Sequence, residues 1–256
     1  MRRAGLAARQ DSFILANRGS VSTGGVLDDL LFEFALAQIL STVESPSIVQ
    51  VGANTGDTSH DMREQLLKSR AAALLVEPQP DVFQILSANY ADVPTVRLAN
   101  VALSNTEGTQ DLFKISQYAD QFHKSGRIFG NSIASFDADH PWEYFLRNAT
   151  EAGQGQPKGK ILESVTVKCQ TFGDLAAEHA IGKVDVLAVD TEGFDFEIIK
   201  MVDSAGLAPI LIKYEHKHLP GGLVGAHQSW QFLVDRGYKI VAVRATGDTV
   251  AWKTSG

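Results

Sequence analysis

Cysteine is almost absent from this sequence of 256 residues, in which Cys169 is the only one. A single cysteine excludes an internal disulfide framework and any metal site built from cysteines, and it fits a reducing compartment. Long apolar stretches are absent too, because no run reaches the roughly 18 residues that cross a membrane. The sequence therefore predicts a chain without a membrane span.

Basic residues are also scarce, since 23 Lys and Arg stand against 30 Asp and Glu and the formal net charge is -7. No dense basic run follows residues 1–3, so the electrostatic footprint of a nucleic-acid-binding protein is missing. Arg9, Gln10 and Asp11 interrupt the start of the chain before an apolar segment of signal-peptide length can form. We expect a cytoplasmic protein that binds no nucleic acid.

The most informative segment runs from Ile48 to Asp57, where an apolar strand pattern breaks into Gly52 and Gly56. Glycines adopt dihedral angles closed to other residues and carry no Cβ, so a ligand can lie directly on the main chain. Asp57 is a favourable N-cap for a helix through about Lys68, whose first amides would face the same ligand. The spacing G-x-x-x-G is neither the dinucleotide fingerprint nor a P-loop. Taken alone, the turn also fits a purely structural connection.

Apolar periodicity divides the chain into an N-terminal helical extension, residues 1–45, and a domain over residues 46–256. The extension contains a predicted helix over 26–42. Three roles are open for this helix: packing on its own domain, a dimer contact or a lid. The apolar residues at helical spacing in it are Leu27, Leu30, Leu31, Phe34, Ala35 and Ile39.

Short apolar strands and helical patterns alternate in the domain, which favours a parallel sheet covered on both faces. Two further strands, 239–244 and 249–253, are separated by a hairpin-sized turn. The predicted strands are 48–51, 72–76, 95–98, 184–189 and 209–214, and helices are predicted over 82–90, 171–179 and 194–202.

A long insertion, residues 114–163, separates the third and fourth predicted strands. Long segments of this kind are usually functional lids or disordered. Its many aromatic residues favour a segment that covers a substrate, although they would equally build a small core. They are Phe122, Phe129, Phe136, Trp142, Tyr144 and Phe145.

Polar residues follow the second and third strands, where ligands of open α/β sheets bind. Glu77 and Pro78 end the second strand, about 20 residues beyond Gly56, where an acid accepts the hydroxyls of a ribose. Glu77 would alternatively cap the next helix. Asn100 and Ala102 end the third strand, where an amide and a small apolar residue flank an adenine ring.

Acidic residues follow the fourth and fifth strands. Asp190 and Glu192 precede a glycine, and Glu215 stands beside His216. Parallel strand ends meet at one edge, so these groups gather in a small volume and disfavour full ionisation. Pairing with surface lysines is the alternative for the glutamates, and His218 is expected at the surface or behind the site.

With these strand ends the chain resembles the FkbM-type family of S-adenosylmethionine-dependent O-methyltransferases, over about residues 48–252. The resemblance implies a class I methyltransferase fold, α/β and Rossmann-like, with a mostly parallel seven-stranded sheet that ends in an antiparallel hairpin. The segments that carry it are Val51–Gly56, Glu77-Pro78, Asn100–Ser104, Val184–Gly193, Glu215 and Gly237-Tyr238.

The resemblance also implies residue roles. The methionine end of the cofactor would lie on the glycine turn, its ribose at Glu77 and its adenine near Asn100. The family usually has an acid at the position of Gln50, so this chain has a weaker charge interaction with the cofactor's amino group. The implied cofactor-binding set is Gln50, Gly52, Ala53, Asn54, Gly56, Glu77, Pro78, Asn100, Ala102 and Asp190.

Methyl transfer to a hydroxyl needs an in-line acceptor and a group that removes its proton. By likeness to sugar O-methyltransferases, Asp190, Glu215 and His216 would bind a Mg²⁺-like cation, with Glu192 as base. Without a metal, His216 is the alternative base. The acceptor is expected to be a sugar, a glycan or a secondary metabolite. The sequence leaves open whether the protein forms a homodimer.

Two other functions compete. An NAD-dependent oxidoreductase or epimerase is disfavoured because the G-x-G-x-x-G and Tyr-x-x-x-Lys patterns are missing. A non-catalytic S-adenosylmethionine-binding module is favoured by Gln50 and opposed by the acids Asp190, Glu192 and Glu215.

Overall fold

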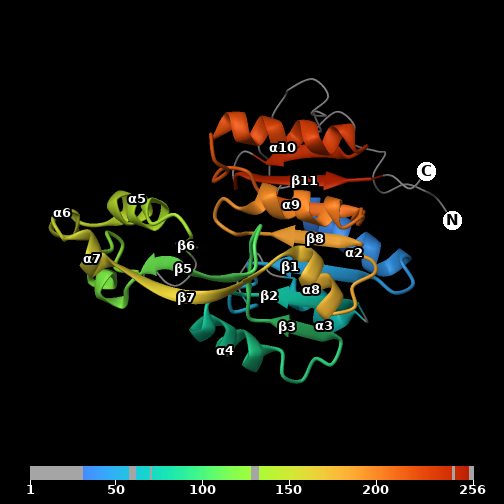
Figure 1. The fold of residues 1–256 in the computed structure, drawn as a ribbon, viewed down its shortest axis with the longest axis horizontal. Coiled ribbons are helices and arrows are strands. Elements are labelled where there is room, and N and C mark those ends of the chain that lie inside the picture. Colours follow the sequence, from blue (N-terminus) through green and yellow to red (C-terminus); the bar gives the residue numbers. More distant parts are fainter. Residues whose placement is uncertain (1–30, 58–61, 70, 128–132, 244–245, 254–256) are drawn as a thin grey trace.

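The computed structural model describes residues 31–57, 62–69, 71–127, 133–243 and 246–253. These residues form a seven-stranded sheet with helices around it and a smaller four-stranded sheet (Figure 1). The strands of the large sheet are β1 (Ser47–Val51), β2 (Ala72–Val76), β3 (Val96–Ala99), β8 (Val186–Val189), β9 (Leu211–Glu215), β10 (Lys239–Val243) and β11 (Asp248–Trp252).

The large sheet has the strand order β10-β11-β9-β8-β1-β2-β3. β11 runs antiparallel to both of its neighbours, whereas β3, β2, β1, β8 and β9 pair in parallel. The predicted mostly parallel sheet with its C-terminal antiparallel hairpin is therefore confirmed. The chain moves outward from β1 to β3 and then returns to β8 on the other side of β1, so the strand order reverses beside β1, where open α/β sheets bind their ligands.

Apolar side chains bury both faces of this sheet, as strands with near-continuous apolar runs require. Helices pack on each face. None of the helices in the described ranges is long and apolar enough to cross a membrane. One face is covered by α8 (Phe172–Glu178), α9 (Asp195–Ser204) and α10 (Leu223–Asp235), and the other by α2 (Leu31–Thr42), α3 (Arg63–Lys68) and α4 (Pro80–Asn89).

Helix α2 packs against its own domain. Residues 26–30 of the predicted helix lie outside the described residues. The buried side includes Phe32 and Leu36, while Phe34 is 72% exposed. Phe34 therefore lies outside the buried stripe, which follows Phe32 and Leu36 at i, i+4 spacing.

Helix α3 begins at Arg63 with Met62 as its N-cap, so the prediction that Asp57 caps it was wrong. Asp57 instead accepts a hydrogen bond from the hydroxyl group of Thr55 at 2.6 Å. Residues 58–61 between the two lie outside the described part of the chain. The first amides of α3 therefore do not follow directly on the glycine turn.

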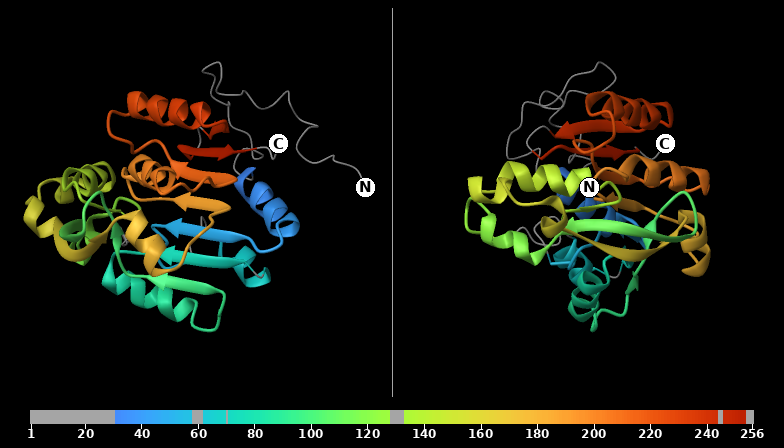
Figure 2. Two further views of the ribbon diagram at one scale, coloured as in Figure 1. Left: turned by 45° about the vertical axis from the view of Figure 1, so that its right-hand side comes forward. Right: turned by 60° about the vertical axis from the view of Figure 1, so that its left-hand side comes forward.

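Two long antiparallel strands, β5 (Gly108–Ile115) and β7 (Leu162–Gln170), carry the insertion away from the large sheet (Figures 1 and 2). With β4 (Ala102–Leu103) and β6 (Ala134–Ser135) they form the four-stranded sheet, in the order β4-β7-β5-β6. Both ends of the predicted segment 114–163 thus lie inside strands.

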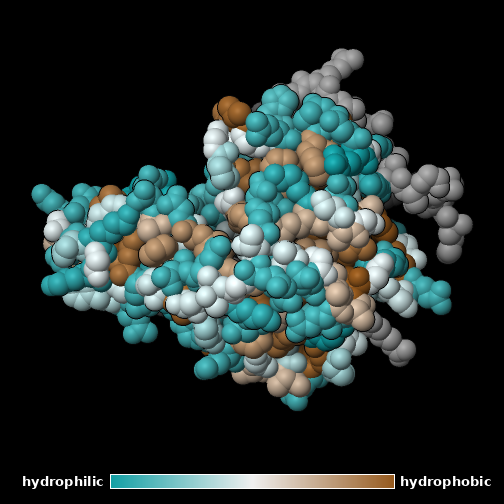
Figure 3. Space-filling model, viewed as in Figure 1, coloured by the Kyte–Doolittle hydropathy of each residue, from teal (hydrophilic) through white to brown (hydrophobic). Residues whose placement is uncertain are grey.

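A helical cap stands at the far end of β5 and β7 and has a small apolar core of its own. Phe145 is fully buried there, and Phe122, Trp142 and Tyr144 pack around it. Figure 3 shows the cap as a projecting lobe with a mostly hydrophilic surface. Its helices are η3 (Gln117–Phe122), α5 (Asp139–Asn148), α6 (Glu151–Gln154) and α7 (Lys158–Ile161).

Of the six aromatic residues named above, four therefore build this core. Phe136 packs instead against the four-stranded sheet and lines the site described below, and Phe129 lies outside the described residues. Near the cap end of β5, Lys114 is almost buried and its Nζ is 2.7 Å from the carboxylate of Asp81 in α4. This ion pair joins the arm to the main domain.

The backbones of β1 and β8 approach closely just beyond their ends. Gly52 has φ +78°, and a Cβ on it would lie 1.8 Å from the carbonyl oxygen of Asp190. Any side chain at this position would force the two strand ends apart. The glycine is therefore required by the packing of the sheet, whatever the ligand.

Gly52→Ala should lower the free energy of unfolding by roughly 3 kcal/mol or more, because the methyl group clashes with backbone and φ is strained. Urea denaturation measures the loss. Gly237→Ala is the matched control, since Gly237 has φ +82° but a Cβ added to it would meet no atom within 4 Å, and it should cost only about 1–2 kcal/mol. Equal losses in the two variants would contradict the role of close approach.

Candidate functional site

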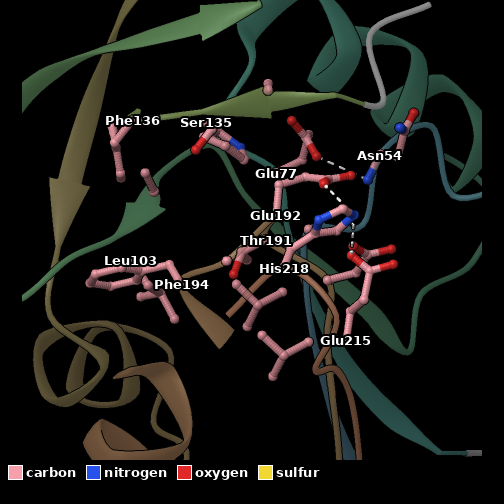
Figure 4. Close-up of a pocket in the computed structure, with 18 of the residues that line it drawn as sticks. Asn54, Glu77, Leu103, Ser135, Phe136, Thr191, Glu192, Phe194, Glu215 and His218 are labelled. Carbon is pink, nitrogen blue, oxygen red and sulfur yellow. Dashed lines mark hydrogen bonds and ion pairs between the residues drawn. The ribbon is translucent and has the colours of Figure 1, made fainter. Parts of the chain in front are cut away.

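A cavity of about 750 Å³ opens at the carboxyl ends of β1, β2, β8 and β9 (Figure 4). The insertion supplies part of its wall through Ser135, Phe136, Asp137 and His140. Its volume lies in the range of cofactor and substrate pockets. The cavity occupies the position at which the reversal of strand order places a ligand.

The glycine turn after β1 offers no free backbone N–H group to a ligand from residues 52–56. Phosphates bind at such turns through unpaired amides, so this turn is unsuited to a pyrophosphate. The amides of residues 52–56 donate to Val76 O (Gly52 and Ala53), to the Glu77 carboxylate (Asn54), to the Asn54 side chain (Thr55) and to Ala53 O (Gly56).

Glu77 connects the second strand end to this turn. Its Oε2 accepts from the amide of Asn54 at 2.9 Å, and its Oε1 accepts from the amide of Gln79 at 3.0 Å. Burial raises the pKa of this carboxyl group, opposed by these hydrogen bonds. Only a carboxylate accepts at both oxygens, so the residue type follows from the geometry. The alternative role of Glu77 was to cap the helix that begins near Asp81. Its two oxygens accept from the amides of Asn54 and Gln79 instead.

Asn100 supports this region without lining the cavity. Its Nδ2 donates to the carbonyl oxygens of Glu77 and Pro78 at 2.8 and 3.1 Å. Pro78 and Ala102 line the cavity. Asn100 therefore fixes the backbone that carries the wall.

Two further residues of the predicted cofactor set lie behind the cavity. Ala53 is 1% exposed in the core. A Cβ on Gly56 would lie 2.4 Å from the ring of Tyr90, whose hydroxyl group donates to the Gly56 carbonyl. These two residues shape the turn through packing.

Gln50 lines the cavity and is 8% exposed. Its Oε1 has no hydrogen-bond partner among the described residues. A buried amide oxygen without a donor costs free energy, so a ligand with an N–H group would satisfy it. Gln50 thus faces the cavity with unused acceptor capacity.

The carboxylates of Asp190, Glu192 and Glu215 come together, with one oxygen of each within 4.8 Å of the others. Burial and then the charge of Asp195 raise the pKa of Asp190 to about 7, although its side chain opens to the cavity. Burial and then the charge of Asp190 raise the pKa of Glu215 to about 8, opposed by Lys217. The cluster therefore favours a bound proton or cation near neutral pH.

Asp195 holds the two loops that carry these acids, and it is completely buried. Its Oδ2 accepts from the hydroxyl and amide groups of Thr191 and from the amide of Gly193, and its Oδ1 accepts from the amide of Glu215 at 3.1 Å. Glu192 between them has φ +55°, a strained value for a residue with a side chain. From the sequence, Asp195 is predicted only to lie in a helix. Its position as an acid in the first helical turn after a strand end is the signal that could have identified its role.

His216 lies outside the cavity lining, so the structure does not bring it together with Asp190. Its Nδ1 is 3.0 Å from the hydroxyl oxygen of Thr249, and its ring packs on Trp230. The reason is the alternation of side chains after β9, which turns His216 away from the face that Glu215 occupies.

His218 and His140 take the place expected for His216. His218, expected at the surface or behind the site, lines the cavity with its imidazole between the carboxylates of Glu192 and Glu215 (Figure 4). His140 of α5 forms a 2.8 Å hydrogen bond between its Nε2 and Oε2 of Glu192. His140 was not predicted from the sequence, because only the fold brings the insertion to this strand end.

Asp195→Asn should lower the free energy of unfolding by about 2–3 kcal/mol, because in either orientation its NH2 group faces at least one of the four N–H and O–H groups that donate to Asp195. Chemical denaturation measures this. Asp203→Asn in the same helix is the control, since its carboxylate pairs with Arg236 at the surface and is worth at most about 1 kcal/mol. A loss at Asp195 no larger than that of the control would sink this role.

No curated protein matches the chain. Among solved structures it is similar to a methyltransferase FkbM from Methylobacillus flagellatus KT, with 10% identity over 81% of this chain and 43% of that one and a TM-score of 0.48. It is also similar to the SAH-bound Podospora anserina methyltransferase PaMTH1, with 10% identity, 88% and 79% coverage and a TM-score of 0.44. This chain thus spans less than half of the first of these structures.

The family comparison covers more of the chain than any single motif. Residues 50–240, which include both acidic loops and most of the large sheet, match the family described as the methyltransferase FkbM domain. The fold and the cavity at its strand ends agree with this match, and the chain belongs to the FkbM methyltransferase family.

Proposed function

We propose that this methyltransferase transfers a methyl group from S-adenosylmethionine to a hydroxyl group of a sugar, glycan or secondary metabolite. The observation that carries the cofactor assignment is the glycine turn, in which the amides of residues 52–56 are all used within the protein. Such a turn leaves carbonyl oxygens and bare main chain, which suit the ammonium and sulfonium charges of this cofactor. Pyrophosphate cofactors need the opposite polarity.

Gln50 supports the same orientation. Its unpaired Oε1 would accept a hydrogen bond from the ammonium group of the cofactor. A neutral amide supplies this hydrogen bond without the charge that an acid would add. The methionine end of the cofactor is therefore held by Gln50, Gly52 and Asn54.

The nucleoside end would lie at Glu77. Its Oε2 accepts one hydrogen bond, from Asn54, and so keeps acceptor capacity for a ribose hydroxyl. Asn100 holds the adjoining backbone, and Pro78 and Ala102 give an apolar wall for the adenine.

The acidic cluster would receive the acceptor hydroxyl. Glu192 is the proposed base, held in place by its hydrogen bond to His140. Positioning of the hydroxyl in line with the sulfonium methyl supplies most of the acceleration. If the transfer is assisted by a hard cation such as Mg²⁺, the oxygens of Asp190, Glu192 and Glu215 fit its ligand preference, and the cation would lower the pKa of the hydroxyl.

The insertion would cover the acceptor. Phe136 gives the cavity wall an aromatic side chain beside Ser135 and Asp137, which carry hydrogen-bonding groups. A sugar ring offers an apolar face for stacking and hydroxyl groups for such partners. This mixed wall supports a sugar-like acceptor.

S-adenosylhomocysteine should raise the melting temperature of the protein, because a ligand that binds only the folded state stabilises it, and NAD should not. Glu77→Gln should weaken S-adenosylhomocysteine binding at least about tenfold, since the amide turns a donor toward the amide of Asn54 or Gln79. Differential scanning fluorimetry measures the first effect and isothermal titration calorimetry the second.

Asp57→Asn is the control for that variant, because it removes the same charge from the same turn at an exposed position. It should leave the dissociation constant within about twofold. Equal weakening by both variants would mean that the charge of the turn, rather than the ribose contact, controls affinity.

Glu192→Gln should abolish methyl transfer while leaving S-adenosylhomocysteine binding within about twofold. Incorporation of labelled methyl groups into a panel of glycans and hydroxylated metabolites measures turnover. Unchanged turnover in the variant would remove Glu192 from the mechanism. Cofactor binding by the wild-type chain with no incorporation into any acceptor would favour a non-catalytic binding module.

A further inference from the structure

Two imidazoles converge on one carboxylate oxygen at the mouth of the cavity. The Nε2 of His140 is 2.8 Å from Oε2 of Glu192, and the Nε2 of His218 is 3.6 Å from the same atom. The three ligand atoms all lie within 4.8 Å of one another. The side chains are mostly shielded, with 17%, 11% and 20% of His140, Glu192 and His218 exposed.

The spacing of these atoms resembles that of ligands around a common ion. Two ligand atoms at tetrahedral positions about 2.1 Å from a zinc ion lie about 3.4 Å apart. The Nε2 of His218 lies 3.6 Å from Glu192 and 3.5 Å from Oε2 of Glu215, too far for a good hydrogen bond to either. Only small shifts would therefore bring these atoms onto one cation.

Holding Glu192 in place as a base requires one imidazole, that of His140. This arrangement gives no role to the second imidazole, that of His218. The rings of His140 and His218 stand edge to face, with centroids 4.7 Å apart. Two imidazoles and a carboxylate are the ligand set of many catalytic zinc sites.

We propose that His140, Glu192 and His218 bind a divalent transition-metal ion of the zinc type, which joins the insertion to the catalytic end of the large sheet. His140 comes from α5 of the cap, whereas Glu192 and His218 follow β8 and β9. The bound ion would keep one position open toward the cavity. Occupation of that position by the acceptor hydroxyl is the part of the inference that rests on the proposed function.

This site differs in chemistry from the oxygen-rich set of Asp190, Glu192 and Glu215, with which it shares Glu192. Imidazole nitrogens select zinc or cobalt, whereas Mg²⁺ prefers oxygen ligands. The two sites are therefore separable by the identity of the ion and by the residues on which its binding depends.

The test is titration of the full-length, untagged and metal-free chain with Co²⁺, in the absence of cofactor and acceptor. We expect visible absorption bands of nitrogen-ligated Co²⁺ that saturate at one ion per chain, and displacement by Zn²⁺ but not by millimolar Mg²⁺. His140→Ala and His218→Ala should each weaken Co²⁺ binding at least about tenfold. Because no methyl transfer is measured, this result and the proposed function can fail independently.

His227→Ala is the matched control, since His227 is exposed on α10 away from the cavity, and it should bind Co²⁺ like the wild type. Melting temperatures of all variants check that they fold. Absence of the cobalt bands in the wild type, or binding by the His140 and His218 variants equal to that of the wild type, would overturn the proposal. Dependence of binding on Asp190→Asn alone would also overturn it, because the ion would then occupy the oxygen-rich set.

Discussion

The fully buried carboxylate of Asp195 is the interaction on which the functional end of this molecule depends. A buried acid is stable only where donors surround it, and here the donors are the backbones of the two loops that follow β8 and β9. The same bonds force Glu192 into a left-handed conformation. The acids of the cavity are thus crowded together because a hydrogen-bonded acid beneath them fixes their backbone.

A second constraint operates at the glycine turn. Gly52 is glycine because β1 and β8 nearly touch, and Gly56 because the ring of Tyr90 fills the space beside it. Packing therefore explains why both positions are glycine. The turn can offer a ligand only those groups that are not already bonded within the protein. Because the amides of residues 52–56 are all hydrogen-bonded within the protein, the turn has no main-chain donor left for a phosphate.

The sequence was sufficient for the large sheet because its strands are short apolar runs between helical patterns, and the acids at their ends follow from parallel pairing. The sequence was not sufficient to predict the positions of side chains that depend on contacts between distant parts of the chain. His216 and His218 differ by two residues, and only the turn after β9 determines which of them meets Glu192. His140 reaches the site from 52 positions away along the chain, through the arm, which no local pattern encodes. Helical spacing alone could not show that Phe34 is exposed, because the sheet selects the buried side of α2.

The cap contains its own small core and meets the main domain through β5, β7, the ion pair of Lys114 with Asp81 and the hydrogen bond of His140 with Glu192. The apolar core of the cap is separate from the two cores beside the large sheet. A substitution inside the core of the cap therefore removes no contact from the large sheet. The sequence of the arm can thus vary while the strand ends that line the cavity keep their positions.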